Sequence, residues 1–181
     1  MICMKNHLLR LSMLAVLGIG LSGCLGIPEG VKPVQDFEIE RYLGTWYEIA
    51  RLDHSFERGL SNVTAEYSLR DDGGVRVINR GFKTSANKWD EAEGKAYFVD
   101  DKTLGKLKVS FFGPFYGAYN VIALDEQAYQ WSLVVGPDTG YLWILSRTPV
   151  LEQAIIEQLI SKAKSHGFDT DKLIFVSQEP G

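Results

Sequence analysis

The chain has 181 residues, of which 45% are hydrophobic and 23% are charged, with a formal net charge of −4. This length suits one domain with a substantial core. The acidic balance argues against binding to a phosphate backbone, so we expect no nucleic-acid partner. The two cysteines and three histidines lack the spacing of a metal site, so we expect no metal or other cofactor.

Residues 1–23 have the composition of an export signal. Lys5 and Arg10 precede an apolar run over residues 11–25, which is too short to span a membrane. The sequence Leu21-Ser22-Gly23-Cys24 resembles the lipobox of bacterial lipoproteins, in which a peptidase cuts before the cysteine and its sulfur carries a diacylglycerol. We therefore expect lipid on Cys24, and a plain secretory signal with a coincidental cysteine is the alternative.

Cleavage before Cys24 would remove Cys3, Lys5 and Arg10 but no acidic residue, so the remaining chain carries a net charge of −6. Cys24 would be its only cysteine, which excludes an internal disulfide. Residues 24–36 contain two prolines and two glycines and predict a lipidated tether. Leu25 follows the cysteine, and the resemblance to lipoproteins implies an outer-membrane location facing the periplasm.

Residues 37–178 form the predicted globular domain, in which short segments typical of β-strands alternate with turn signals. The expected strands cover residues 43–52, 62–70, 75–82, 89–99, 106–112, 117–124, 129–135 and 141–146. Thr148 as N-cap and Pro149 at the first helical position then predict a helix with an apolar stripe, which ends at Gly167. A short final strand is expected over residues 173–177.

These elements predict an all-β fold, an eight-stranded antiparallel up-and-down β-barrel with one C-terminal α-helix and a short final strand. A two-sheet sandwich is the alternative that strand counting leaves open.

The sequence Gly44-Thr45-Trp46-Tyr47, followed at a distance by Leu145-Ser146-Arg147-Thr148-Pro149, resembles two signature blocks of the lipocalins. The resemblance extends over residues 37–178, although residues 119–124 match the family's remaining block only loosely. With the lipobox and the apolar stretch 111–117, it is strongest for bacterial outer-membrane members. It implies that Gly44, Trp46 and Arg147 are structural, with the arginine lying across the tryptophan at the closed end of the barrel.

Alternation along the strands then predicts which side chains face the barrel interior. Glu48 is expected to face inward and to need a partner there, because desolvating a carboxylate is costly. The parity of Tyr97, Tyr116 and Tyr119 is ambiguous. The predicted ligand-binding lining is Ala50, Ala65, Tyr67, Leu69, Tyr97, Val109, Phe111, Tyr116, Tyr119, Tyr141 and Trp143.

This apolar lining suits an acyl chain with a small polar head, and the resemblance also implies fatty acids or lysophospholipids as ligands. The predicted function is a membrane-anchored carrier that holds or moves such lipids during envelope maintenance or stress. A periplasmic interaction or inhibitor module acting through the barrel loops is one alternative. A lipid-ester hydrolase is the other and less favoured one.

We expect no catalytic residues. Asp53, His54 and Ser55 are adjacent in sequence and cannot present a triad, which is assembled across a fold. The apolar tip 113–117 could contact ligand, membrane or a second copy in a homodimer, or be an ordinary turn.

Overall fold

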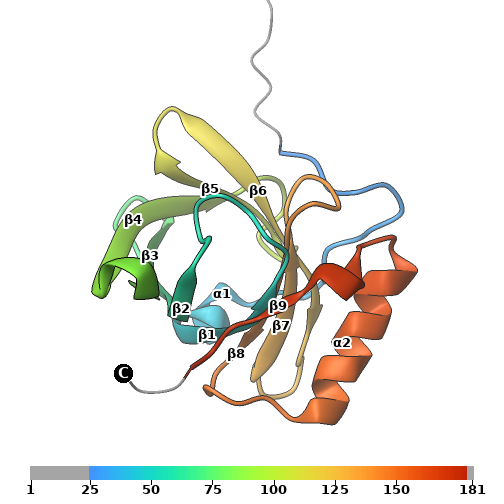
Figure 1. Cartoon of the computed structure of the whole chain (residues 1–181). Coiled ribbons are helices and arrows are strands. Elements are labelled where there is room, and N and C mark those ends of the chain that lie inside the picture. Colours follow the sequence, from blue (N-terminus) through green and yellow to red (C-terminus); the bar gives the residue numbers. More distant parts are fainter. Residues whose placement is uncertain (1–24, 179–181) are drawn as a thin grey trace, which may run out of the picture.

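A computed structural model describes residues 25–178 (Figure 1). The predicted signal 1–23 and Cys24 lie outside the described residues. The barrel strands are β1 (Gly44–Arg51), β2 (Leu60–Leu69), β3 (Val75–Lys83), β4 (Lys88–Phe98), β5 (Lys106–Phe112), β6 (Phe115–Leu124), β7 (Trp131–Val135) and β8 (Leu142–Ser146). The remaining elements are α1 (Ile39–Tyr42), α2 (Gln153–Ser165), β9 (Ile174–Phe175) and the 3₁₀ turns η1 (Thr84–Ala86) and η2 (Thr170–Lys172).

The eight strands β1 to β8 close into a barrel. Each pairs antiparallel with the next, and β1 pairs with both β8 and β2, which leaves no free edge in the ring. The short strand β9 pairs with β1 outside the ring. The predicted barrel is therefore confirmed, and the sandwich alternative is wrong.

Trp46 and Arg147 seal one end of the barrel. Trp46 is fully buried, and the guanidinium carbon of Arg147 lies 4.0 Å from the centre of its ring. Arg147 also donates hydrogen bonds to the backbone oxygens of Arg41 (2.7 Å), Thr45 (3.0 Å) and Tyr129 (3.2 Å). This contact ties the two signature blocks together and stabilises the closed end.

Gly44 begins β1 beneath this arginine with φ +92°, a backbone conformation that side chains rarely adopt. A Cβ there would also stand 3.4 Å from Arg147 Nη1. The glycine of the signature is thus required by the backbone turn and by the close approach of the arginine.

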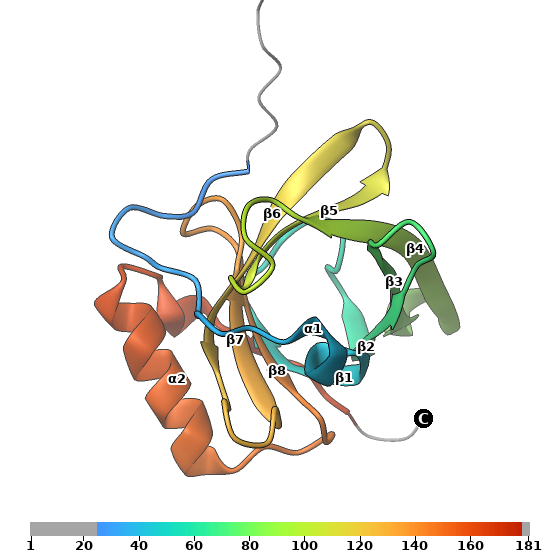
Figure 2. The same ribbon diagram turned by 180° about the vertical axis from the view of Figure 1, so that it is seen from behind.

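Helix α2 packs against the outside of the barrel, as both ribbon views show (Figures 1 and 2). Its buried face is formed by Ile156, Leu159 and Ala163. These residues form a second core with outward-facing barrel residues such as Ala50 and Leu133. Burying this apolar stripe gives the helix most of its stability.

The helix begins later than the sequence predicts. Its N-cap is Glu152, whereas Thr148 uses its hydroxyl to donate to the backbone oxygen of Val150 at 2.7 Å. The backbone N–H of Thr148 in turn donates to Ser146 Oγ at 3.2 Å. Thr148 and Pro149 therefore form a turn after β8 rather than the start of the helix.

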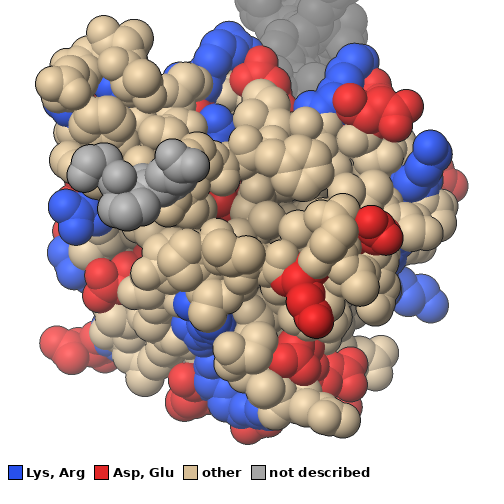
Figure 3. Space-filling model, turned by 60° about the horizontal axis from the view of Figure 1, so that its bottom comes forward, with Lys and Arg blue, Asp and Glu red and all other residues tan. Residues whose placement is uncertain are grey.

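The connections between strands define two ends of the barrel. The turns β1–β2, β3–β4, β5–β6 and β7–β8 lie at the open end, and α1 and the remaining connections lie at the closed end. In both ribbon views the β5–β6 hairpin and the start of the described chain lie at the top. Figure 3 brings the bottom of the molecule forward, and that face carries side chains of both charges.

Candidate ligand-binding cavity

The barrel encloses a cavity with an empty space of about 860 Å³, including the part that opens to solvent. Its lining comes from α1, from the loop between β1 and β2, and from seven of the barrel strands. The apolar members are Ile39, Phe56, Val63, Ala65, Val75, Val77, Ala96, Leu107, Val109, Phe111, Ala118 and Leu145.

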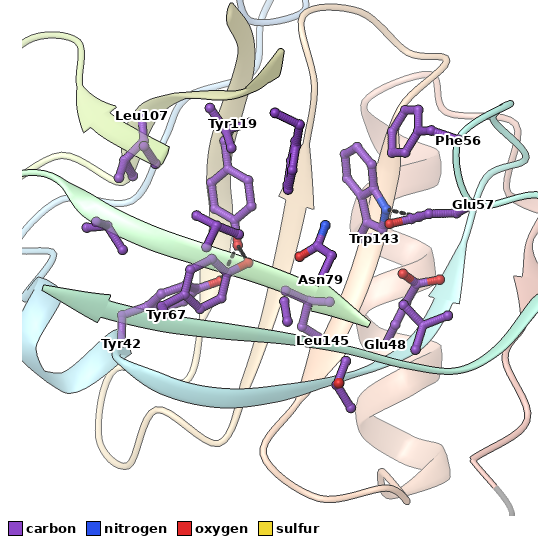
Figure 4. Close-up of a pocket in the computed structure, with 18 of the residues that line it drawn as sticks. Tyr42, Glu48, Phe56, Glu57, Tyr67, Asn79, Leu107, Tyr119, Trp143 and Leu145 are labelled. Carbon is purple, nitrogen blue, oxygen red and sulfur yellow. Dashed lines mark hydrogen bonds between the residues drawn. The ribbon is translucent and has the colours of Figure 1, made fainter. Parts of the chain in front are cut away.

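The structure places six of the eleven residues of the predicted lining in the cavity wall. The lining includes Ala65, Tyr67, Val109, Phe111, Tyr119 and Trp143, together with Glu48, which was also expected to face inward. Four of these side chains are aromatic, and the close-up labels Tyr67, Tyr119 and Trp143 among them (Figure 4). Whether they touch a ligand stays a prediction.

Two residues of the predicted lining, Ala50 and Leu69, lie outside the cavity wall. A bulge interrupts β1 before Ala50, and β2 ends at Leu69. The pairing of β1 with β8 shifts between Glu48 and Ala50, and this bulge turns Ala50 to the outer face, where it packs in the core beneath α2. Leu69 is the last residue of β2 and is 54% exposed near the closed end. Neither side chain lines the cavity.

Three predicted tyrosines are also outside the lining. Ala96 lines the cavity, so its neighbour Tyr97 points outward, and its hydroxyl donates to Asp72 at 2.8 Å. Tyr116 lies on the same outer face, where the centre of its ring is 6.4 Å from the centre of the Tyr97 ring. Tyr141 stacks on His54 at 6.0 Å, just before β8.

The structure adds lining residues that alternation does not predict: Tyr42, Phe56, Glu57 and Asn79. Tyr42 belongs to α1, a single helical turn with no sequence periodicity to reveal it. Phe56 and Glu57 belong to the loop between β1 and β2. The long-range packing of these segments, not their local pattern, brings them to the cavity.

Three tyrosine hydroxyls form a connected group in the cavity. Tyr119 is hydrogen-bonded to both Tyr42 and Tyr67, at 2.9 Å each, and Tyr42 also bonds Ser132 Oγ at 3.0 Å (Figure 4). Burial raises the pKa of Tyr42 to about 12 and that of Tyr119 well above its usual value. The group is therefore uncharged at neutral pH and gives the cavity one polar spot in an apolar wall.

A second polar group surrounds the buried guanidinium of Arg51. Its Nη1 donates to Glu48 Oε1 at 2.6 Å, and its Nη2 donates to the backbone oxygens of Glu57 (2.9 Å) and Leu60 (3.3 Å). Arg51 is 2% exposed and Glu48 3%. The arginine thus fastens the loop after β1 to the end of that strand and compensates the buried carboxylate.

Glu48 and Glu57 share this desolvated region. Burial, followed by the nearby charge of Glu57, raises the pKa of Glu48 to about 8, although Arg51 opposes the shift. Burial also raises the pKa of Glu57, against the hydrogen bond from Trp143. With one arginine facing two buried carboxyls, one of the carboxyls holds a proton at neutral pH.

His54 completes the polar group at the open end. Its Nε2 lies 3.2 Å from Glu57 Oε2, and its ring stacks on Phe56 at 4.1 Å. Burial, reinforced by the charge of Arg51, lowers the pKa of His54 to about 4. The imidazole is therefore neutral at neutral pH and adds no positive charge to the site.

Residues 25–178 contain no cluster of histidine, cysteine or acidic residues that could hold a metal ion. Within the same range, no helix is long and apolar enough to cross a membrane. The site thus consists of an apolar chamber, three neutral tyrosine hydroxyls and the polar group around Arg51, whose charges nearly balance. This arrangement suits non-covalent binding of an apolar molecule with a polar end.

The chain is similar to two bacterial proteins named outer membrane lipoprotein Blc. It is 58% identical to the one from Vibrio cholerae over 94% of this chain and 100% of that protein. It is also 58% identical to the one from Escherichia coli K12 over 85% of this chain and 86% of that protein. Among solved structures, insecticyanin from the tobacco hornworm Manduca sexta is 26% identical, with a TM-score of 0.67 over 84% of this chain and 86% of that one.

A family model described as a lipocalin-like domain matches residues 37–178. The lipocalins are a family of binding proteins, and the relatives named above belong to it. The closed barrel, the Trp46–Arg147 contact and these similarities together show that the chain belongs to the lipocalin family.

Proposed function

We propose that this protein is a lipid-anchored carrier of single-chain lipids at the bacterial outer membrane. In this proposal Cys24 carries the anchor, the domain faces the periplasm, and a fatty acid or lysophospholipid occupies the barrel. The name of the Vibrio cholerae and Escherichia coli relatives, outer membrane lipoprotein, supports the location. The lipobox residues Leu21-Ser22-Gly23-Cys24 support the anchor.

The observation that carries the proposal is the apolar chamber with polar groups at two positions in its wall. Burying about fifteen methylenes, at roughly 0.8 kcal/mol each, contributes on the order of 12 kcal/mol. Losing the translational and rotational freedom of the ligand offsets about 4–15 kcal/mol of that. The acyl chain alone therefore gives modest affinity, and polar contacts to the head group must supply the rest.

The polar groups support one orientation of the ligand. Glu48, Glu57 and Trp143 lie toward the open end, and the hydroxyl group of Tyr42, Tyr67 and Tyr119 lies deeper (Figure 4). A head group at the open end would meet carboxyl and indole partners while keeping contact with water. The acyl chain would then run toward the tyrosines and the plug formed by Trp46.

Native mass spectrometry of the delipidated protein mixed with lysophospholipids or fatty acids tests this function, with displacement of a fluorescent fatty acid as a second measurement. Ala96→Phe places a large side chain in the cavity and should weaken binding by about tenfold or more, since it removes space for several methylenes. Ala154→Phe on the exposed face of α2 is the matched control and should bind normally. Absence of any adduct with the unmodified protein would refute the proposal.

We also propose that the carrier removes or stores single-chain lipids during envelope stress. Cells that lack the protein should then accumulate lysophospholipids in the outer membrane under stress, and expression of Ala96→Phe should not correct the defect. Equal lysophospholipid content with and without the protein would contradict this role.

A further inference from the structure

The β5–β6 hairpin exposes two aromatic side chains at its tip. Phe112 is 81% exposed and Phe115 is 71% exposed, and Gly113 and Pro114 form the turn between them. Neither phenylalanine lines the cavity. Adjacent exposed aromatic residues at the end of a hairpin are unusual on a soluble surface and indicate a contact with something apolar.

The described chain begins at the same end of the barrel. The backbone oxygen of Gly26 accepts a hydrogen bond from Asn120 Nδ2 at 3.2 Å, and the Cα of Gly26 is directed so that a Cβ would meet the oxygen of Pro137 at 3.7 Å. Pro137 lies in the turn between β7 and β8, at the open end. The tether is thus fixed beside the mouth of the cavity rather than beside its closed end.

The tether leaves little freedom to the anchor. Cys24 precedes Gly26 by two residues in the sequence, and two residues of fully extended chain can span at most about 7 Å. Asn120, whose side chain holds Gly26, lies five residues along β6 from Phe115, which is the first residue of β6 at the hairpin tip. Five residues of strand extend about 16 Å, so the hairpin tip reaches beyond the tether toward the surface that holds the anchor.

We infer that the open end of the barrel faces the lipid bilayer and that Phe112 and Phe115 insert among its lipids. This inference rests on the proposed lipid anchor at Cys24. Phe56, 60% exposed on the loop between β1 and β2, lies at the same end and next to the cavity. The mouth of the cavity is then held against the membrane, so an acyl chain passes between bilayer and barrel with little exposure to water.

Among residues 25–178, the opposite end of the barrel carries no pair of exposed aromatic residues like Phe112 and Phe115. Val150 is 80% exposed in the connection between β8 and α2, but the closed end around it carries charged residues such as Arg41 and Glu38. Figure 3 shows charged side chains of both signs on the bottom face. A bilayer contact there would desolvate these charges, which is unfavourable. The exposed Val150 therefore serves as a matched control site.

The test places a polarity-sensitive dye on single cysteines in the full chain, processed and purified from membranes. Once Cys3 has left with the signal and Cys24 carries lipid, Phe115→Cys and Val150→Cys each supply the only free thiol. The proteins are reconstituted in vesicles of phosphatidylethanolamine and phosphatidylglycerol with brominated acyl chains. The dye at position 115 should lose about half or more of its emission to the bromines, because bromine quenches only at contact within the acyl region. The dye at position 150 should keep its emission.

Equal emission from the dyes at positions 115 and 150 would overturn the inference. It would also be overturned if the dye at position 115 were shielded without bromine quenching and in proportion to protein concentration, because a second copy of the protein would then cover the tip. An unmodified protein that accepts dye has a free Cys24 and refutes the anchor and this inference together. For each of these outcomes, binding of a fluorescent fatty acid by the same protein shows separately whether the cavity holds ligand, so a failure of this inference can be told apart from a failure of the proposed carrier function.

A second pair of variants measures the consequence for transfer. Phe112→Ser with Phe115→Ser should slow the movement of a fluorescent lysophospholipid from vesicles into the anchored protein several-fold. Leu69→Ser with Val150→Ser, at the other end, should leave the rate unchanged. Affinity for the same lipid dispersed without vesicles should be equal in both variants, and a parallel loss of affinity in the first would overturn the inference.

Discussion

The indole Nε1 of Trp143 donates a hydrogen bond of 3.0 Å to Glu57 Oε2 and so joins β8 to the loop that follows β1. The two residues are 86 positions apart in sequence. Both line the cavity, and the bond places a fluorescent ring beside a buried carboxyl (Figure 4). A ligand head group at the open end would therefore change the surroundings of this indole directly.

Trp143 should report ligand binding by its fluorescence. A lysophospholipid titration of the unmodified protein should shift or quench the tryptophan emission, and Trp143→Phe should abolish most of that change because the other tryptophans lie outside the cavity lining. Trp131→Phe, which alters a ring packed in the core beneath α2, is the control and should leave the change intact. An undiminished signal in Trp143→Phe would place the ligand elsewhere.

The buried carboxyls should make stability depend on pH. The pKa of Glu48 is raised to about 8 in the folded protein, above its unfolded value of 4.5, so the folded state binds more protons between these pH values. The contribution of this group to the free energy of unfolding should therefore be fully present below about pH 4.5, fall as pH rises from 4.5 to 8, and level off above 8. Urea unfolding across this range measures the slope.

Glu57→Gln should reduce the loss of unfolding free energy between pH 4.5 and 8, because it removes one of the two buried carboxyls and, with it, the charge that after burial contributes most to the raised pKa of Glu48. The glutamine oxygen can still accept the hydrogen bond from Trp143. Glu93→Gln, on the exposed surface, serves as control and should leave the slope unchanged. A slope unaffected by Glu57→Gln would mean that the two carboxyls are not coupled.

The tyrosine hydroxyls should behave as a coupled group. Tyr119→Phe leaves the buried hydroxyl of Tyr67 without its hydrogen-bond partner and should cost about 1–3 kcal/mol of unfolding free energy. Tyr67→Phe removes only the outer member of the group and should cost less. The double variant should then be more stable than the sum of the single losses predicts, whereas strict additivity in denaturant unfolding would contradict the coupling.

Arg147→Met should destabilise the protein by about 2 kcal/mol, since it removes the cation over Trp46 and three hydrogen bonds to backbone oxygens while keeping an apolar stem. Arg80 also lies over an indole, that of Trp89 at 5.7 Å, but both residues are exposed. Arg80→Met should therefore cost less than about 0.5 kcal/mol. Equal losses of unfolding free energy in the two variants would show that the Arg147–Trp46 contact stabilises the fold no more than the exposed Arg80–Trp89 contact does.

The strands, the helix and the closed end could be predicted from sequence because their signals are local. Alternation with period two marks each strand, the apolar stripe marks α2, and the signature residues Gly44, Trp46 and Arg147 mark the plug. The start of α2 was misplaced because Thr148 and Pro149 carry a helix-start pattern that a turn after β8 uses instead.

The cavity lining was only partly predictable, since alternation fails wherever the backbone departs from a regular strand. The bulge after Glu48 turns Ala50 outward, and nothing in the sequence reveals it. The parity of Tyr97 and Tyr116 depends on the register of β4, β5 and β6, which strand pairing fixes. Local pattern therefore specifies that a residue is in a strand but not always which face it occupies.

The sequence by itself determined the strands, the helix and the apolar character of the interior, because each depends on residues within a few positions of one another; the barrel and its plug followed from the resemblance to the lipocalin signature. Only the tertiary structure decided that Arg51, Glu57 and Trp143 meet at the open end and that Gly26 is fixed beside the same mouth. The reason is that contacts between residues far apart in the chain are set by how the barrel closes.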